Sequence, residues 1–310
     1  MAKITLASRT PLPLALLRAT RPRQWTKNLL LYLALAFSIN QAWEPSDLGQ
    51  AGRLLGTASI GFVLFCALAG AVYLLNDIQD VEKDRAHPTK RERPIAAGTL
   101  PLPVAWSALV VLAVLGLAFG YRLGLGFGLA ATTYVAIEVA YSYWLKHVVL
   151  LDVFAIAAGF VLRAVAGALA IHVVISPWLY LVAFLGALFI AFTKRRQELL
   201  TLEEQAPDHR PILQEYSPQL IDALLGVVTA STLIAYSLYT FSAEGLPKNH
   251  ALMLTIPFLA YGIFRYYYLV HTRNLGAAPE EVLLKDWPLL VDILLWLATT
   301  MIVLVAFPRA

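Results

Sequence analysis

Nine apolar stretches separated by short polar segments dominate the hydrophobic pattern of the chain. They cover residues 29–43, 54–75, 104–121, 125–143, 150–171, 178–193, 221–241, 252–270 and 287–307. A helix needs about 20 mainly apolar residues to cross a bilayer, so most of these stretches are long enough. The first and the sixth are short, and we expect them to tilt or to extend into flanking polar residues. The pattern predicts an all-α integral membrane protein with about nine transmembrane helices.

Composition supports a membrane protein and excludes several other classes. Only 14% of the residues are charged and 59% are hydrophobic, whereas soluble chains carry about 25% charged residues. This excludes a disordered protein, a secreted disulfide scaffold and a soluble enzyme with a membrane tail. The single cysteine, Cys66, can form no internal disulfide. We interpret the net charge of +4 as anchoring at the cytoplasmic face and expect no nucleic-acid partner.

The distribution of basic residues predicts the orientation. With a cytoplasmic N-terminus, the cytoplasmic segments carry eighteen Lys and Arg residues and the opposite segments carry four, as the positive-inside rule requires. Basic residues such as Lys3 and Arg9 without a cleavage site argue against a signal peptide. We expect a cytoplasmic segment at 1–28, in which residues 11–18 could lie along the membrane surface. A single nine-helix domain is predicted at 29–310, in the cytoplasmic membrane.

An acidic motif directly follows the second apolar stretch. If the helix continues, Asn76, Asp80 and Asp84 lie at i, i+4 and i+8 on one face, with Asp77 beside them. Like charges at this spacing repel, so the cluster requires a cation. Carboxylates together with substrate phosphates are typical ligands of Mg²⁺. The sequence therefore predicts a Mg²⁺ site rather than a solvated helix end, with Glu82 pointing away from it.

Basic and polar residues recur at the same predicted membrane level. Two prolines order the loop at 87–94, whose cationic side chains suit an oligophosphate. The residues concerned are Lys27, Asn28, Lys90, Arg93, Tyr141, Lys146, Asp152, Lys194 and Arg195. Each group alone is typical of positive-inside anchoring. Because four groups share one level with the acidic motif, we expect them to form the rim of one cavity.

Arg163 is the most informative residue inside an apolar stretch. It lies eleven residues beyond Asp152, about 16 Å along a helix, near the middle of the hydrocarbon core. A buried Arg at this depth is costly and marks a functional site by default. Two interpretations remain open: a structural pair with Glu138, or a cavity-lining residue that binds an anionic group.

These motifs resemble the UbiA-type intramembrane prenyltransferase superfamily along nearly the whole chain. Longer strings narrow the resemblance: Arg-Pro-Arg-Gln-Trp-x-Lys-Asn at 21–28, Asn-Asp followed by His-Pro-Thr-Lys-Arg-x-Arg-Pro-Ile-Ala-Ala-Gly within 76–98, and Tyr-Ser-x-x-Leu-Lys-His at 141–147. The segments 151–167 and 194–199 extend it. Together they look like the decaprenyl-phosphate phosphoribosyltransferases, which move 5-phosphoribose from phosphoribosyl diphosphate to a polyprenyl phosphate.

The resemblance implies a role for each motif. Mg²⁺ held by Asp77, Asp80 and Asp84 would neutralise the leaving diphosphate, and an oxygen of the lipid phosphate would displace it with inversion, giving a β-linked product. No strong general base is required, because that phosphate is already mostly anionic. The implied catalytic residues are Asp77, Asp80, Asp84, Asn76 and Lys27. The implied substrate-binding residues are Asn28, Lys90, Arg93, Tyr141, Lys146, Asp152, Arg163, Lys194 and Arg195.

Two other functions remain open. One is transfer of a prenyl group from a prenyl diphosphate to an aromatic acceptor. Ordinary prenyltransferases carry a second pair of acids, whereas here Asp152 stands alone, with Ala155 and Ile156 where a partner acid would lie. The other is a transporter whose substrate path includes Arg163 and Glu138. Chain length of the lipid and oligomeric state are left open by the sequence.

Overall fold

The computed structural model describes residues 11–174, 176–204, 211–243, 246–273, 282 and 285–307. Lys3 and Arg9 lie outside these ranges. Within them all regular secondary structure is helical, and the isolated bridge between Ile39 and Trp43 is the only β pairing. The all-α prediction is confirmed for the described residues.

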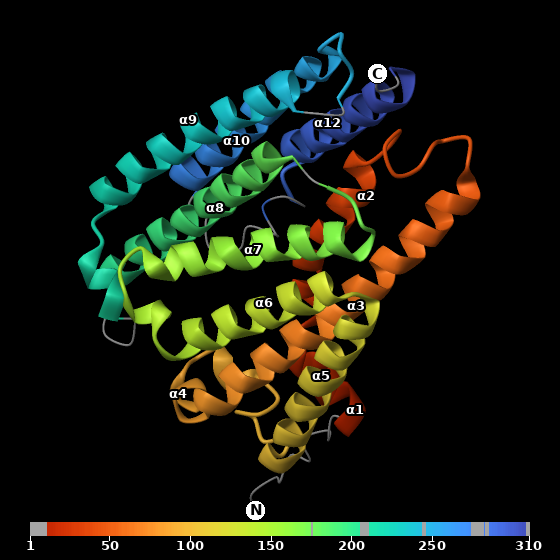
Figure 1. Cartoon of the computed structure of the whole chain (residues 1–310). Coiled ribbons are helices and arrows are strands. Elements are labelled where there is room, and N and C mark those ends of the chain that lie inside the picture. The colour runs from red at the N-terminus through yellow and green to blue at the C-terminus, as the bar shows by residue number, and fades with distance from the viewer. Residues whose placement is uncertain are drawn as a thin grey trace, which may run out of the picture.

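The helices follow one another with short connections. Their bounds are α1 Leu12–Ala19, η1 Pro22–Tyr32, α2 Leu33–Phe37, α3 Leu48–Gln79, α4 Val81–Ala86, η2 Lys90–Glu92, α5 Leu102–Leu123, α6 Leu125–Tyr143, η3 Leu145–His147, α7 Leu151–Ala170, α8 Pro177–Glu204, η4 Pro211–Glu215, α9 Pro218–Ser242, η5 Ala251–Thr255, α10 Ile256–Arg273 and α12 Trp287–Ala306. Figure 1 shows α1 and α5 at the bottom of the view, α9, α10 and α12 at the top and α6, α7 and α8 between them, while α3 runs from the upper right to the lower left.

Six of the described helices are long and apolar enough to cross a membrane. They are α3, α5, α7, residues Pro177–Leu200 of α8, α9 and α12. Helices α6 and α10 have 19 and 18 residues, and Glu138 and Arg265 lower their hydropathy. The chain is thus a multi-pass membrane protein. The full set of nine spans and the orientation stay predictions.

The two short apolar stretches extend into polar sequence, as expected. The sixth becomes α8, which continues to Glu204. The first begins as the 3-10 helix η1 at Pro22, before its apolar residues, and ends in the five-residue helix α2. Runs of 3-10 helix longer than about four residues are uncommon, so the eleven residues of η1 are an unusual element. The residues expected at the membrane surface form α1, on which Leu12 and Leu17 are each 46% exposed.

Helix η1 packs between α3 and α7. The approach to α7 is so close that a Cβ atom on Gly167 would lie 2.1 Å from the carbonyl oxygen of Leu31. Glycine is therefore required at this position. Leu31, Phe65, Phe127 and Tyr134 form part of the core that surrounds this contact. A second core joins α7, α8, α9 and α10. The packing places η1 between the helices that carry Asp77 and Arg163.

Candidate active site

The acidic motif lies where α3 passes into α4. The first helix ends at Gln79, and Asp80 joins it to α4 with backbone angles of −95° and 12°. Backbone hydrogen bonds nevertheless continue through the joint, from Asp80 N to the Asn76 oxygen at 3.0 Å and from Asp84 N to the Asp80 oxygen at 2.8 Å. The helical path therefore carries the motif out of the bundle with only a local change of direction.

Two carboxylates of this motif are buried and bound by arginines. Asp77 is 2% exposed and Asp84 is 3% exposed. The Nη1 atom of Arg93 donates to Asp77 Oδ1 at 3.1 Å and to Asp84 Oδ2 at 2.7 Å. Arg21 also donates to Asp77 Oδ1, and its guanidinium lies over the ring of Tyr73, 4.8 Å from the centroid. The residues around one buried carboxylate thus come from α3, from the position after η2 and from the position before η1.

The structure shows which carboxylates of the motif converge. The carboxylates that converge are those of Asp77 and Asp84, two helical turns apart, whereas Asn76 and Asp80 are half-buried beside them. Residues seven positions apart lie within about 20° of each other around an α-helix, so Asp77 and Asp84 share one face while Asn76 and Asp80 lie to its side. Glu82 is exposed and pairs with Arg85 at 2.8 Å, so it points away as expected.

Arg163 is held by three polar groups in the interior. It is 4% exposed. Its Nε donates to Asn28 Oδ1 at 2.8 Å, Nη1 to the Gly159 carbonyl at 2.7 Å and Nη2 to the Tyr134 hydroxyl at 2.9 Å. Tyr134 is also hydrogen-bonded to Glu138. Among the described residues no ion pair joins Arg163 directly to Glu138, but Glu138 Oε1 and Arg163 Nη1 both face Gly159, lying 3.1 and 3.4 Å from where a Cβ atom would be. Both interpretations of Arg163 stay predictions, and neither named Asn28 or Tyr134 as its hydrogen-bond partner.

A second buried ion pair joins α7 to α8. Arg195 is 1% exposed, and its Nε donates to Asp152 Oδ2 at 2.6 Å. Its Nη1 donates to Glu198 and its Nη2 to the Tyr141 hydroxyl at 3.3 Å. All three guanidinium nitrogens are engaged within the protein. A direct phosphate contact by Arg195 stays a prediction, and the observed contacts are those of a residue that fixes Asp152.

Tyr216 completes this second cluster. Its hydroxyl donates to Asp152 Oδ1 at 2.7 Å and accepts from the Leu150 backbone N–H at 2.7 Å. Burial, together with the hydrogen bond to Asp152, raises the pKa of Tyr216 well above its usual range. The hydroxyl therefore remains a donor at neutral pH.

The remaining basic residues of the predicted rim are more accessible. Lys90 and Lys194 are exposed, and Lys27 and Lys146 are half-buried. Lys27 and Arg163 are the cations within electrostatic range of Glu138. The segment around η1 therefore connects two groups of the predicted site, through Arg21 to Asp77 and through Asn28 to Arg163. A single cavity shared by all the predicted residues stays a prediction.

This combination of fold and acidic motif has close counterparts among known proteins. The UbiA prenyltransferase family matches residues 28–284, most of the chain. The chain belongs to this family. The decaprenyl-phosphate phosphoribosyltransferase of Mycolicibacterium smegmatis is 34% identical, over 92% of this chain and 90% of the relative. The enzyme of that name in Corynebacterium glutamicum is 36% identical, over 91% of this chain and 84% of the relative.

A solved structure of a UbiA homologue from Archaeoglobus fulgidus bound to DMAPP and Mg²⁺ shares the fold. It aligns with a TM-score of 0.71 at 20% identity, covering 94% of this chain and 99% of that one. Together with the family membership, these matches confirm the resemblance found in the sequence and the prediction of a membrane-embedded transferase.

The UbiA-family chain offers Mg²⁺ a suitable set of donors. Mg²⁺ is commonly bound by one or two carboxylates together with waters and substrate phosphates, and the buried oxygens of Asp77 and Asp84 converge as such a pair. Among the described residues, no three His, Cys, Asp or Glu side chains form a metal-binding group. The pair therefore fits Mg²⁺ shared with a diphosphate, and Asp80 as a third ligand stays a prediction.

Sequence reasoning missed several residues of these clusters. Arg21 was part of a quoted motif but had no assigned role, and Tyr134, Glu198 and Tyr216 were not singled out. Tyr134 lies one helical turn before Glu138 and Glu198 lies three residues after Arg195, spacings at which helical side chains meet. These two could have been found. Tyr216 reaches Asp152 across 64 positions, and no local pattern reveals such a contact.

Proposed function

We propose that this UbiA-family chain transfers 5-phosphoribose from phosphoribosyl diphosphate to a polyprenyl phosphate and releases diphosphate. Relatives with a matching name cover about nine-tenths of the chain, at 34% and 36% identity. The environment of Asp152 is the structural observation that favours phosphoribosyl diphosphate over a prenyl diphosphate as the donor. Its carboxylate is bound by the buried Arg195 and Tyr216, and the next helical turn offers Ala155 and Ile156 rather than a second acid. A second Mg²⁺ cluster of the prenyltransferase kind would lack its second acid there.

The acidic and basic side chains would bind the donor together. Mg²⁺, held by Asp77 and Asp84 with Asp80 as a further ligand and Asn76 beside them, would neutralise charge on the leaving diphosphate. The side chains of Arg21 and Arg93 are each 28% exposed, so they can reach phosphate oxygens while remaining beside Asp77. Lys27, Lys90, Lys146 and Lys194 would supply further positive charge at the rim. Positioning and charge neutralisation account for most of the rate in such a site.

The acceptor needs little activation. A phosphate monoester with a second pKa near 6 is mostly dianionic at neutral pH, so an oxygen of the polyprenyl phosphate attacks ribose C1 without a general base. The C1–O bond to diphosphate breaks as the new C1–O bond forms. Direct displacement inverts C1 and gives a β-linked product from an α-configured donor. The apolar chain would lie between helices, in contact with the bilayer.

Arg163 would position this site and also contact an anionic group. Three of its five N–H donors are used by Asn28, Gly159 and Tyr134, so two remain available. Because Asn28 belongs to η1, the same residue fixes the segment that carries Lys27. We assign Arg163 a positioning role and a ligand contact through the remaining donors.

A defined assay tests the activity. Purified full-length protein is incubated with labelled phosphoribosyl diphosphate, polyprenyl phosphate and Mg²⁺, and in parallel with geranyl diphosphate and an aromatic acceptor. We expect a labelled lipid in the first reaction, loss of that product with a chelator, and its return with added Mg²⁺. No labelled lipid together with turnover of the prenyl diphosphate would establish the alternative, aromatic prenyl transfer.

We also propose that the site faces the cytoplasm, with all nine helical regions embedded in the membrane. The support is the excess of eighteen basic residues over four on the two predicted sides. Lys83 and Lys248 are both exposed and lie on opposite predicted sides. In a Cys66→Ala background, a membrane-impermeant maleimide added to intact cells should label Lys248→Cys and leave Lys83→Cys unlabelled. The reverse pattern would overturn the orientation.

A further inference from the structure

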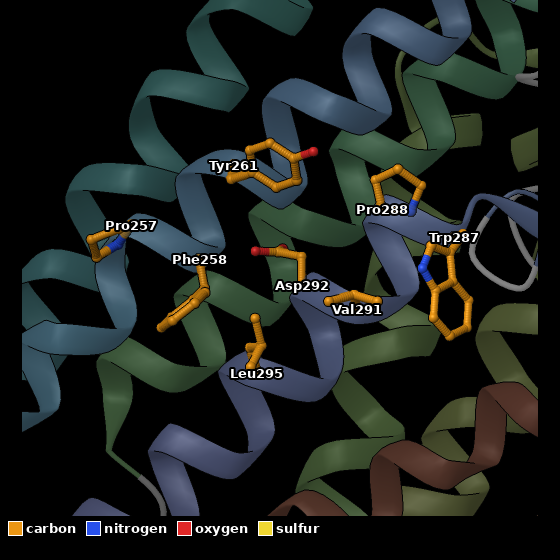
Figure 2. A pocket seen from close by; sticks show the side chains of 8 residues that line it. All are labelled: Pro257, Phe258, Tyr261, Trp287, Pro288, Val291, Asp292 and Leu295. Atoms are coloured by element: carbon orange, nitrogen blue, oxygen red, sulfur yellow. The ribbon is translucent and has the colours of Figure 1, made fainter.

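An apolar groove lies between α10 and α12, two helices that carry none of the site residues described above. It has a volume of about 570 Å³. Its walls include Phe258 and Tyr261 from α10 and Trp287, Val291 and Leu295 from α12, as Figure 2 shows. Tyr261 is 47% exposed and Trp287 is 70% exposed, so the groove opens on the outer surface of the helix pair.

An acidic side chain lies at the base of this groove. Asp292 is 7% exposed and contributes to the groove lining, and Figure 2 shows its carboxylate between the two helices. In the part of the chain that the structure describes, it has no hydrogen-bond partner and no cation near it. A Cβ atom on Gly262 would lie 2.9 Å from Asp292 Oδ2. The glycine therefore makes room for a carboxylate that nothing described satisfies.

The position of Asp292 along α12 fits the boundary between lipid headgroups and acyl chains. Trp287 begins the helix, and tryptophan is enriched at the membrane interface. Asp292 follows five residues later, about 7.5 Å along the axis. Interfacial groups commonly lie about 5–10 Å deep in this boundary. An amphiphile could place its headgroup beside Asp292 and its chain along Leu295 and Phe258.

We propose that this groove binds an amphiphile with an ammonium headgroup, such as an aminolipid. A cation satisfies the buried carboxylate, and ammonium ions are also attracted to the faces of aromatic rings such as those of Tyr261 and Trp287. The apolar walls suit a hydrocarbon chain. An anionic lipid is repelled by Asp292, so the groove does not suit the polyprenyl phosphate acceptor. The site is separate from the proposed transferase site and does not depend on that activity.

Native mass spectrometry of the full chain in a neutral maltoside detergent tests the proposal. The probes are dodecylammonium, dodecanol and dodecyl phosphate, which share one chain and differ in charge, and methylammonium, which lacks the chain. We expect one dodecylammonium to bind at least about tenfold more tightly than the other three probes, since contacts to a charged group exceed neutral ones by this margin. Equal binding of dodecanol or dodecyl phosphate would overturn the proposal. Equal binding of methylammonium would show that the hydrocarbon chain contributes nothing, and would overturn an amphiphile as the occupant.

Variants locate the bound probe. Asp292→Asn keeps the shape and removes the charge, and it should weaken dodecylammonium binding about tenfold or more. Tyr261→Leu, at an exposed position, should weaken it about threefold. Glu44→Gln removes the same charge from an exposed loop residue and should leave binding unchanged. Unaltered binding in a folded Asp292→Asn protein would exclude the site, and if that variant fails to fold, unaltered binding in Tyr261→Leu excludes it.

Discussion

The cluster around Asp77 and Asp84 and the cluster around Asp152 differ in their access to solvent. In the first, Asp77 and Asp84 are buried but the side chains of their partners Arg21 and Arg93 are each 28% exposed. In the second, Asp152 and Arg195 are 0% and 1% exposed, and Tyr216, Tyr141 and Glu198 close the network. The first cluster reaches the surface through its arginines, whereas in the second the pair of Asp152 and Arg195 is sealed and the surface is reached only through Glu198, whose side chain is 26% exposed.

The difference in access implies a difference in role. An arginine that is partly exposed can change partner from a carboxylate to a phosphate with little desolvation. An arginine that is fully buried and bound by two carboxylates cannot, because removing either partner leaves an uncompensated buried charge. We therefore expect similar residue types to bind the ligand at the first site and to connect α7 to α8 at the second. The predictions below test this contrast.

Arg195→Met should have the largest effect, on stability. It leaves Asp152 and Glu198 without their cation, and breaking a buried pair from one side costs about 3–5 kcal/mol. The neighbouring substitution Arg196→Met is the control, because Arg196 pairs with the more exposed Asp222 and should cost about 1 kcal/mol or less. Thermal unfolding in detergent measures both. Equal losses in the two variants would contradict a sealed second cluster.

Asp77→Asn should have the next largest effect, on activity. The variant removes a buried carboxylate that binds Arg21 and Arg93 and would hold Mg²⁺, so we expect kcat to fall about 100- to 1000-fold, the scale seen when a preorganised electrostatic group is lost. The two arginines can reach solvent, so the unfolding temperature should change little. Glu82→Gln, on the exposed side of the motif, should retain activity. A similar loss of activity at Glu82 would show that the motif acts through bulk charge.

Arg163→Lys should reduce activity about tenfold while the fold persists. Lysine keeps the charge but lacks the planar fork that reaches Asn28, Gly159 and Tyr134 at once. The matched control is Arg265→Lys, at a partly exposed arginine that pairs with Asp286, which should remain active. If Glu138→Gln restores the stability and activity of Arg163→Met, Arg163 is instead a structural partner of Glu138, and the assignment to the site is wrong.

Asp286 should contribute a small stability that depends on pH. The hydrogen bond from Arg265 holds the pKa of Asp286 below its usual range. This stabilisation is therefore present above about pH 4, the unfolded pKa, and is lost as pH falls through the lower folded pKa. Asparagine can still cap α12, so Asp286→Asn removes the ion pair alone, worth about 0.2–1 kcal/mol. Unfolding temperatures between pH 3 and 7 should converge for wild type and variant at the acidic end.

Local patterns predicted most of the fold and part of the site. Apolar stretches identified the helices because a bilayer demands long runs of apolar residues. The proximity of Asp77 to Arg93 was predictable because the acidic motif at 76–84 and the basic loop at 87–94 follow one another in the sequence. The convergence of Asp77 and Asp84 could also have been predicted, because residues seven positions apart lie on nearly the same face of a helix. The partners of Arg163 and Asp152 come from distant segments, and only tertiary packing brings them together.

The 3-10 geometry of η1 determines how far apart Arg21 and Asn28 lie along the segment. Arg21 contacts Asp77 and Asn28 contacts Arg163, and seven positions separate the two anchors. At about 2.0 Å per residue a 3-10 helix spans about 14 Å over that interval, whereas an α-helix spans about 10.5 Å. The length of the segment between Arg21 and Asn28 is therefore what allows both contacts to form at once. A substitution that favours α-helix over 3-10 helix would shorten this segment. It would then break either the Arg21–Asp77 contact or the Asn28–Arg163 contact, even with all four of these side chains unchanged.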